Sequence, residues 1–286
     1  MMNMKGTGAS HGAATIVNAI AMGKGAAFGL DLRTEATVEL SEGDGVSVVM
    51  DGHPGESTVL AERCVQGVLE RVAEGRKYHA EVRTRSQIPI SKGLKSSSAA
   101  ANAIVLATLD ALGQEMEPLD AVRIGTRAAV EAKVSITGAF DDACACHLGG
   151  MVITDNRSEE LLVHENFPDY VRVLIHIPEF TVRKADLPRE RIKAVSGLVD
   201  LAFHHALEGD RHRALTLNGL CYSTALGLDP EVQLKALMNG ALAAGLSGTG
   251  PATVMVVVED KVKEFTEAMS GYDLLEVRVR NPEGRA

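Results

Sequence analysis

The sequence between residues 89 and 100 reads Pro89-Ile90-Ser91-Lys92-Gly93-Leu94-Lys95-Ser96-Ser97-Ser98-Ala99-Ala100. Its serines lead into an apolar segment that predicts a helix from about Ser97 to Leu112. The first N–H groups of a helix lack internal partners and carry partial positive charge, so they favour a bound anion. Gly93 lets the backbone approach such an anion, and Lys92 and Lys95 add mobile positive charge. The stretch therefore predicts a phosphate-binding loop, although serines also begin many helices that bind nothing.

Two other short segments favour phosphate chemistry. A second glycine-rich turn covers residues 245–251, and the acidic pair Asp141-Asp142 follows Gly138. The P-loop pattern Gly-x4-Gly-Lys-Ser/Thr is absent, since Gly23-Lys24 is followed by Gly25. No Rossmann glycine fingerprint joins a strand to a helix either, because the turn at 245–251 precedes a predicted strand. That turn is expected to wrap a ligand or simply to reverse the chain.

Composition excludes several classes of protein. The 286 residues carry a net charge of −9, which argues against a nucleic-acid partner. The four cysteines lack zinc or disulfide spacing and indicate a reducing cytoplasm. Cys144 and Cys146 are expected on one face of an extended segment. The sequence shows no signal-peptide pattern and no apolar run of about 18 residues, so neither secretion nor a membrane span is expected.

Helical and strand-like patterns are mixed without strict alternation, which favours an α+β fold with two domains, residues 1–155 and 156–286. The boundary is placed at a polar turn, residues 155–160. Besides extended segments within residues 13–32, strands are expected at 34–40, 45–50, 79–87, 151–154, 171–177, 252–258 and 274–280. Helices are expected at 57–74, 97–112, 118–133, 187–207, 211–226, 230–244 and 261–269.

Three motifs, in order, resemble those of the galactokinase–homoserine kinase–mevalonate kinase–phosphomevalonate kinase (GHMP) superfamily. They are Pro89-x3-Gly93-Leu94-x-Ser96-Ser97-x-Ala99, Gly138-x-x-Asp141 and Gly245-Leu246-Ser247-Gly248-Thr249-Gly250-Pro251. The resemblance covers almost the whole chain. It implies an N-terminal domain like the second domain of ribosomal protein S5, a ferredoxin-like C-terminal domain and ATP bound between them.

A narrower resemblance points to the archaeal-type shikimate kinases. It rests on residues 14–32, on Thr137-Gly138-Ala139-Phe140-Asp141-Asp142-Ala143 and on residues 246–251. It implies transfer of the ATP γ-phosphoryl group to the 3-hydroxyl of shikimate, giving the shikimate 3-phosphate of aromatic amino acid biosynthesis. The alternatives are a sister kinase acting on homoserine or mevalonate, and a non-catalytic relative that binds a metabolite.

The resemblance assigns the nucleotide to the two glycine segments. Ser97 aligns with the metal-contacting serine of the superfamily, and Glu131, ten residues before Asp141, is expected to complete a Mg²⁺ site with waters. The alternative for Glu131 is an exposed helix carboxylate. The expected ATP-binding residues are Pro89, Lys92, Gly93, Leu94, Lys95, Ser96, Ser97, Ser98, Ala99, Gly248, Thr249 and Gly250.

Either member of the acidic pair could be the catalytic carboxylate. Counting forward from Gly138 favours Asp141 as the group that orients the acceptor hydroxyl or takes its proton. Counting back from Gly149-Gly150 favours Asp142 instead. Lys24 is expected either to stabilise charge on the transferred phosphoryl group or to help bind the substrate.

The acceptor side of the site is the part on which the sequence is least specific. Asn18 and Thr181 are candidate substrate contacts. A substrate carboxylate suits the two-pronged guanidinium of an arginine, for which Arg183 is the first candidate and Arg33 the second. The partners expected are ATP and a small molecule, and the sequence leaves monomer and homodimer open.

Overall fold

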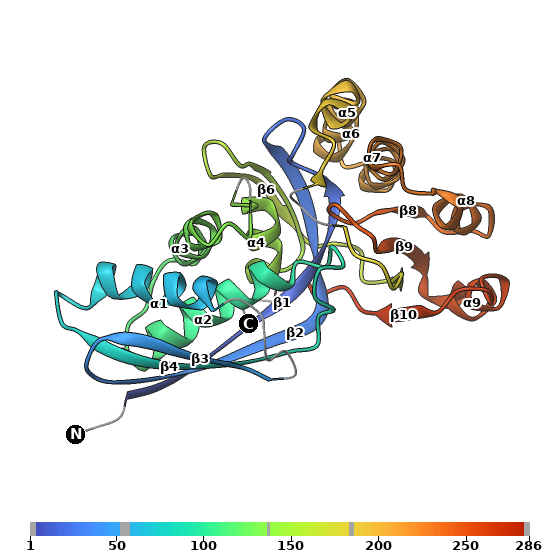
Figure 1. The fold of residues 1–286 in the computed structure, drawn as a ribbon. Coiled ribbons are helices and arrows are strands. Elements are labelled where there is room, and N and C mark those ends of the chain that lie inside the picture. Colours follow the sequence, from blue (N-terminus) through green and yellow to red (C-terminus); the bar gives the residue numbers. More distant parts are fainter. Residues whose placement is uncertain (1–3, 52–57, 136–137, 183–185, 283–286) are drawn as a thin grey trace.

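The first sheet is built around a long antiparallel pair, β1 (Met4–Val17) and β2 (Lys24–Glu42). The computed structural model describes residues 4–51, 58–135, 138–182 and 186–282. In it the sheet has the order β3-β4-β2-β5-β6, with β1 also paired to β2 (Figure 1). The remaining strands are β3 (Gly45–Met50), β4 (Tyr78–Ser86), β5 (Met151–Asp155) and β6 (Glu160–Glu165).

In the described part of the chain, the helices of this half are α1 (Val59–Val72), α2 (Ser96–Ala111), α3 (Pro118–Glu131) and α4 (Phe140–Leu148). Helices α2 and α4 pack on β1 and β2, while α1 and α3 pack against α2 (Figure 1). Because α2 is covered by the sheet on one side and by helices on the other, buried residues surround it. Its N-terminal turn is thereby held in a fixed place.

The second sheet has the order β10-β7-β9-β8. It consists of β7 (Val171–His176), β8 (Ala243–Leu246), β9 (Thr253–Val258) and β10 (Leu274–Val277). Met255 and Val257 of β9 pack in one cluster with α8 (Glu231–Met238) and α9 (Val262–Ala268). Val254 and Val256 point the other way, as alternate residues of a strand must, into the main core. The helices α5 (Arg189–Ala194), α6 (Ser196–Leu207) and α7 (Arg211–Leu226) complete this half.

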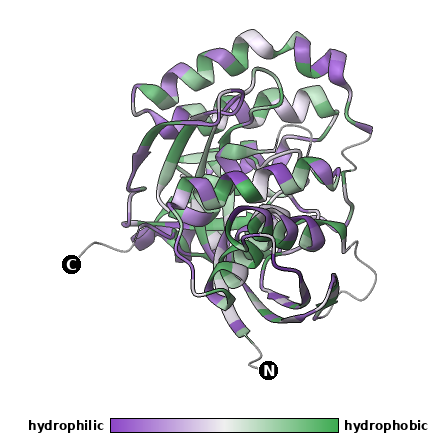
Figure 2. Ribbon diagram, turned by 90° about the vertical axis from the view of Figure 1, so that its left-hand side faces the viewer, coloured by the Kyte–Doolittle hydropathy of each residue, from purple (hydrophilic) through white to green (hydrophobic). Residues whose placement is uncertain are grey.

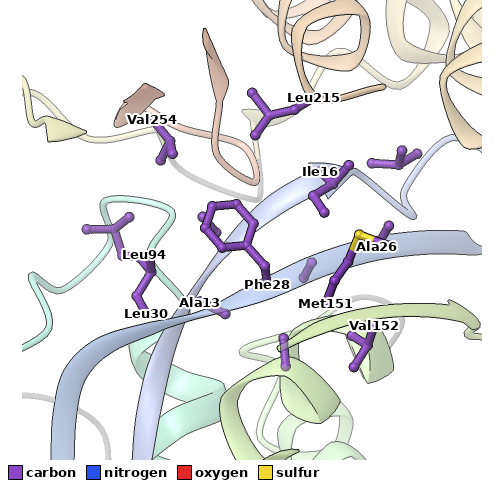
Figure 3. Packing of buried hydrophobic residues seen from close by; sticks show 14 of the residues in the cluster. Ala13, Ile16, Ala26, Phe28, Leu30, Leu94, Met151, Val152, Leu215 and Val254 are labelled. Atoms are coloured by element: carbon purple, nitrogen blue, oxygen red, sulfur yellow. The ribbon is translucent and has the colours of Figure 1, made fainter. Parts of the chain in front are cut away.

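One hydrophobic core joins the two halves. Phe28 of β2 lies among Ile16, Met151 and residues of the second half such as Leu215 and Val254 (Figure 3). Its ring also stacks on Phe167, with ring centroids 4.3 Å apart. Several helices carry hydrophilic and hydrophobic stretches in alternation, as amphipathic helices do (Figure 2). The two sheets therefore share buried apolar surface, and the cavity described below lies at their junction.

Residues 278–281 leave the second sheet and return to the first. Asp31 N donates to Arg278 O at 2.9 Å, and Arg280 N donates to Gly29 O at 3.0 Å. The side chain of Asn281 then bonds both backbone groups of Phe167, at 2.8 and 2.9 Å. Late residues of the chain thus add backbone pairing to β2.

The α+β class predicted from the sequence is confirmed, but some elements differ from the predictions. Residues 140–148 form α4, so Cys144 and Cys146 lie buried on a helix rather than on an extended segment. The helix predicted over 230–244 ends at Met238, because residues 243–246 pair with β9 as β8. The helix predicted over 187–207 divides at Val195 into α5 and α6.

The expected domain boundary at 155/156 falls in the turn between β5 and β6, and both of these strands belong to the first sheet. The sheets themselves favour a division between Glu165 and Val171. Within the described part of the chain, no helix is long and apolar enough to cross a membrane.

Candidate active site

A cavity of about 500 Å³ opens where the N-termini of α2 and α4 meet the glycine turn that follows β8. It brings together all three motifs singled out in the sequence. Contributions also come from the end of β1, the loop after it and the end of α3. Its walls are formed by Thr15, Asn18, Ala19, Ile20, Ile90, Ser91, Gly93, Lys95, Ser96, Ser97, Ser98, Ala129, Lys133, Val134, Ser135, Ala139, Asp141, Asp142, Thr181, Val182, Gly248, Thr249 and Gly250.

The phosphate loop, residues 93–98, faces this cavity. Helix α2 begins at Ser96, and the first helical bond runs from Ala99 N to Lys95 O. The N–H groups of the three serines therefore have no partner within the helix and lie beside the cavity that the serines line. Gly93 has a φ of +86°, and a Cβ there would lie 2.2 Å from Ser247 O. Its lack of a side chain thus allows the two glycine segments to touch.

The side chain of Lys95 is buried in the site and held by two partners, rather than mobile as the sequence suggested. Its Nζ donates to Thr15 Oγ1 at 2.7 Å and lies 3.0 Å from Asp142 Oδ1. The same Thr15 hydroxyl accepts a hydrogen bond from Gly248 N at 2.8 Å. Lys95 therefore connects β1, the phosphate loop, α4 and the second glycine turn.

Asp141 lies deeper than its neighbour and is only 3 % exposed. Asn156 Nδ2 donates to its Oδ1 at 2.8 Å. Its Oδ2 lies against the backbone of β2, where a Cβ on Gly25 would be 2.2 Å from that oxygen. Burial, and next the charge of Asp142, raise the pKa of Asp141 to about 7, while the Asn156 hydrogen bond and Lys95 act in the opposite direction.

Several of the residues expected in the site line the cavity. They are Asn18, Gly93, Lys95, Ser96, Ser97, Ser98, Asp141, Asp142, Thr181, Gly248, Thr249 and Gly250. The loop containing Asn18 is held by α7, since Asn18 N donates to Asn218 Oδ1 at 3.0 Å and Tyr222 OH donates to Asn18 O at 3.2 Å. The second half of the molecule thereby fixes one wall of the cavity.

Other expected residues lie elsewhere. Lys92 Nζ donates to the carbonyl oxygens of Pro178, Glu179 and Phe180 at 2.6, 2.7 and 2.9 Å, so its ammonium is already satisfied away from the cavity. Leu94 and Ala99 are buried in the core, and Pro89 does not line the cavity.

Three charged residues expected in the site are also absent from the cavity lining. Lys24 Nζ lies 5.6 Å from the ring centre of Phe203. Arg33 pairs with Glu35 on an exposed strand face. Glu131 ends α3 with its carboxylate half exposed and 3.7 Å from Arg63 Nε, so the structure does not bring it to the cavity. Arg183 lies outside the described residues.

Sequence reasoning missed three polar residues that organise the site. Thr15 lies in the N-terminal segment that carries the narrower resemblance but was given no role, and Asn156 lies in a segment interpreted only as a polar turn. Ser247 was quoted within the second glycine turn but given no role, yet its hydroxyl donates to Gly93 O at 2.8 Å. The Asp-Asn pair at residues 155 and 156, directly after a buried strand, was the one local signal available for Asn156.

The donor set of the cavity suits Mg²⁺ bound together with a nucleotide. The described residues contain no cluster of three or more His, Cys, Asp or Glu side chains that could hold a metal by themselves. Ser97, in the phosphate loop, is one of the residues that line the cavity. Mg²⁺ commonly takes few protein ligands and completes its shell with phosphate oxygens and water, so one hydroxyl here is compatible with it.

Known proteins match this chain along most of its length. A family model for the GHMP kinases N terminal domain matches residues 60–150. The shikimate kinase of Methanothrix thermoacetophila is 48 % identical over 284 residues, 99 % of this chain and 96 % of that protein. The shikimate kinase of Methanosarcina acetivorans is 48 % identical over 93 % of this chain and 90 % of its own length, and that of Halobacterium salinarum is 45 % identical over 92 % of each.

Solved structures with the same fold are more distant in sequence. Homoserine kinase from Cytophaga hutchinsonii superposes with a TM-score of 0.76 at 21 % identity, covering 99 % of this chain and 97 % of its own. The mevalonate kinase of Methanococcus jannaschii superposes with a TM-score of 0.75 at 14 % identity, covering 98 % and 99 % respectively. At such identities the likeness establishes the fold.

Proposed function

The chain belongs to the shikimate kinase family, of GHMP kinase fold, and on that premise we propose that it transfers the γ-phosphoryl group of ATP to the 3-hydroxyl of shikimate. The sequence relatives named above are all shikimate kinases, at 45–48 % identity over nearly the whole chain. The homoserine and mevalonate kinases share the fold at only 14–21 % identity. The relatives thus favour shikimate over the acceptors of the sister kinases.

One observation carries the proposal. A single cavity of about 500 Å³ holds both the unpaired N-terminal turn of α2 and the two carboxylates of α4. The helix terminus and the three serines would bind the β- and γ-phosphates of ATP. The carboxylates line the same cavity, where an acceptor hydroxyl would meet the terminal phosphoryl group. Such positioning, with neutralisation of the developing charge, is most of what phosphoryl transfer requires.

Within this proposal the two carboxylates have different tasks. Asp141 takes the proton of the attacking hydroxyl, since its raised pKa of about 7 is suited to a general base near neutral pH. Asp142 instead holds the Lys95 ammonium beside the phosphate loop. There Lys95 would offset the negative charge that collects on the transferred group.

Mg²⁺ would neutralise the β- and γ-phosphate oxygens during transfer. Ser97 is the residue proposed to contact it, with nucleotide oxygens and waters filling the remaining positions. Glu131 would join this shell only by giving up its ion pair with Arg63.

The acceptor is proposed to bind between the loop after β1 and the segment after β7. Asn18 and Thr181 line this part of the cavity. Arg183, two residues beyond Thr181, keeps its proposed role as the partner of the shikimate carboxylate. We place the reaction in the cytoplasm, in keeping with four free, buried cysteines.

The proposal is tested by an ADP-release assay with ATP and Mg²⁺ in which shikimate, homoserine and mevalonate are offered separately. Turnover is expected with shikimate, and the product should carry its phosphate on the 3-hydroxyl by ³¹P NMR. Turnover with another acceptor alone would retain the nucleotide site and reject the proposed substrate. Absence of turnover with all three would favour a binding protein of the same fold.

A further inference from the structure

The side-chain amide of Asn156 forms two hydrogen bonds with Asp141. Its Nδ2 donates to Asp141 Oδ1 at 2.8 Å, and its Oδ1 accepts from Asp141 N at 3.2 Å. A backbone N–H can only donate, so the amide oxygen must be the atom that faces it. The NH₂ group is then necessarily turned towards the carboxylate. The direction of both bonds follows from the chemistry of the groups.

Asn156 is itself held firmly. It is 7 % exposed, and its backbone N–H donates to Gly23 O at 2.8 Å. Thr154, the last buried residue of β5, donates its hydroxyl to Asn156 Oδ1 at 2.6 Å. Both lone pairs of the amide oxygen are therefore used, which fixes the rotation of the side chain. The rigid element behind Asp141 is β5 with the turn that follows it.

The carboxylate is confined from the other side as well. A Cβ on Gly25 would lie 2.2 Å from Asp141 Oδ2, so this oxygen rests directly against the backbone of β2. With Oδ1 bound by Asn156 and Oδ2 against β2, the plane of the carboxylate has little freedom to turn. A general base needs such restraint, because proton transfer depends on a short, aligned approach to the hydroxyl.

We propose that Asn156 is a positioning residue for phosphoryl transfer, which orients the Asp141 carboxylate towards the acceptor hydroxyl and keeps it ready to accept a proton. The inference rests on the proposed kinase activity. It assigns a role to the neutral hydrogen-bond donor that contacts the Asp141 carboxylate. No motif of the sequence pointed to this residue.

The surroundings of Asp141 explain why a neutral donor matters there. Burial and Asp142 favour its protonated form, whereas Lys95 and the Asn156 hydrogen bond favour the carboxylate. Cys144 of α4 and Tyr222 of α7 also lie near it, and burial raises the pKa of each, so both stay uncharged at neutral pH. Removing the Asn156 donor should therefore raise the pKa of Asp141 further.

The test measures kcat as a function of pH for the parent protein and for the variants Asn156→Asp and Asn156→Ala. Asn156→Asp keeps the size of the side chain and its acceptor oxygen but replaces the donor with a second carboxyl oxygen, whose charge would itself raise the pKa of Asp141, so Asn156→Ala is the variant that tests loss of the donor alone. We expect kcat at pH 7 to fall about 100-fold in either variant, the effect of a misplaced catalytic group. The acid limb of the profile should move up by about one pH unit or more. The KM for ATP should change less than about twofold, since the phosphate loop is untouched.

Asn102→Ala is the matched control. Asn102 is also a buried asparagine bonded to α4, through Nδ2 to Ala143 O at 2.9 Å, but the bond reaches a backbone carbonyl rather than a carboxylate. Asn102→Ala should have a lower free energy of unfolding than the parent, but the acid limb of its kcat profile should lie at the same pH as in the parent. If the Asn156 variants also keep that limb, whatever their kcat, Asn156 is merely structural and the inference is overturned.

A second readout separates this inference from the proposed function. Selective ¹³C labelling of aspartate, with Asp141→Asn to assign the signal, reports the pKa of Asp141 by NMR in the protein without nucleotide. An upward shift in Asn156→Ala, which removes the donor without adding a charge, is expected. An unmoved pKa overturns the inference even in an active kinase. A parent protein that phosphorylates none of the three acceptors overturns the proposed function instead.

Discussion

The two sides of the α4 N-terminus make contrasting environments from adjacent residues. On the inner side, Asp141 is bound by the neutral amide of Asn156 and rests against β2 at Gly25. On the loop side, Asp142 is 17 % exposed and pairs with the Lys95 ammonium, which also bonds Thr15. Successive residues of a helix point about 100° apart, so one step along the chain exchanges one environment for the other.

The contrast shows how a repeated residue type acquires two functions. A carboxylate with a neutral partner in a buried place holds its proton up to about neutral pH, as Asp141 does. A carboxylate beside a buried ammonium is better suited to orient that cation. Asp141 and Asp142 are identical residues in the sequence, and the surrounding strands and loops give them different environments.

The sharpest test of this contrast exchanges each carboxylate for its amide. Asp141→Asn should lower kcat about 1,000-fold, because an amide cannot take the hydroxyl proton, within the range that general bases contribute. Asp142→Asn should lower it less and should raise the KM for ATP, since Lys95 loses its partner. Steady-state kinetics with shikimate and ATP measure both. If Asp142→Asn instead abolishes turnover and Asp141→Asn is mild, the two roles are reversed.

The environment on the loop side can be tested by removing the Lys95 ammonium. Lys95→Met should reduce kcat/KM for ATP about 100-fold, because a buried charge facing the phosphates is removed. It should also lower the free energy of unfolding by about 3 kcal/mol, since Asp142 is left without its partner. Urea unfolding measures the second effect. The double variant Lys95→Met with Asp142→Asn should recover most of that stability but none of the activity, which separates folding from catalysis.

On the inner side, the buried carboxylate of Asp141 should lower the free energy of unfolding at high pH, and Asp141→Asn should remove this cost. In the folded protein the pKa of Asp141 is about 7, above its ordinary value of 3.8, so the folded state holds the extra proton between these pH values. Its contribution is therefore most favourable below about pH 4 and is lost as pH rises towards 7. Asp141→Asn should be more stable than the parent at pH 8 by about 2 kcal/mol, and the gain should shrink by pH 5. A gain that is equal at both pH values would contradict the raised pKa.

The smallest effect is expected at Thr15. Its hydroxyl accepts bonds from Lys95 and Gly248, so its single proton remains to be donated, and the residue lines the cavity. Thr15→Val keeps the shape and should raise the KM for ATP about 5-fold, the effect of about 1 kcal/mol of hydrogen bonding. Thr15→Ser keeps the hydroxyl and should stay within about twofold of the parent. Equal kinetics in the two variants would remove Thr15 from the phosphate site.

Much of the cavity could be predicted because its parts are local. A glycine turn, three serines and an apolar run place the start of α2 at Ser96, one residue from the prediction. The pairings could not be predicted in the same way, since they join residues far apart in the sequence. The bond from Lys95 to Thr15 spans 80 residues and that from Gly248 to Thr15 spans 233. Only the packing of β1 against both loops decides them.

The misplaced residues have a similar cause. Lys92 and Lys95 carry the same charge in the same motif, yet Lys92 bonds three carbonyls of the segment after β7. Glu131 has the spacing of a metal ligand, but at the end of α3 it meets Arg63 of α1. Sequence spacing predicts the element on which a residue lies. The partners that its side chain contacts depend on which other elements pack beside it.

The return of residues 278–281 to β2 has a consequence for how the protein is made. Ribosomes extend a chain at roughly 5–20 residues per second, and the earlier part of a chain generally folds first. Here Gly29 N already donates to Gly150 O, but Gly29 O and Asp31 N gain the hydrogen bonds described above only when residues 280 and 278 have been made. During synthesis these two groups of β2 therefore lack those partners until most of the second half has emerged. The last backbone bonds of β2 thus depend on residues made about 250 positions later, so the first half does not reach its final hydrogen bonding when it folds alone.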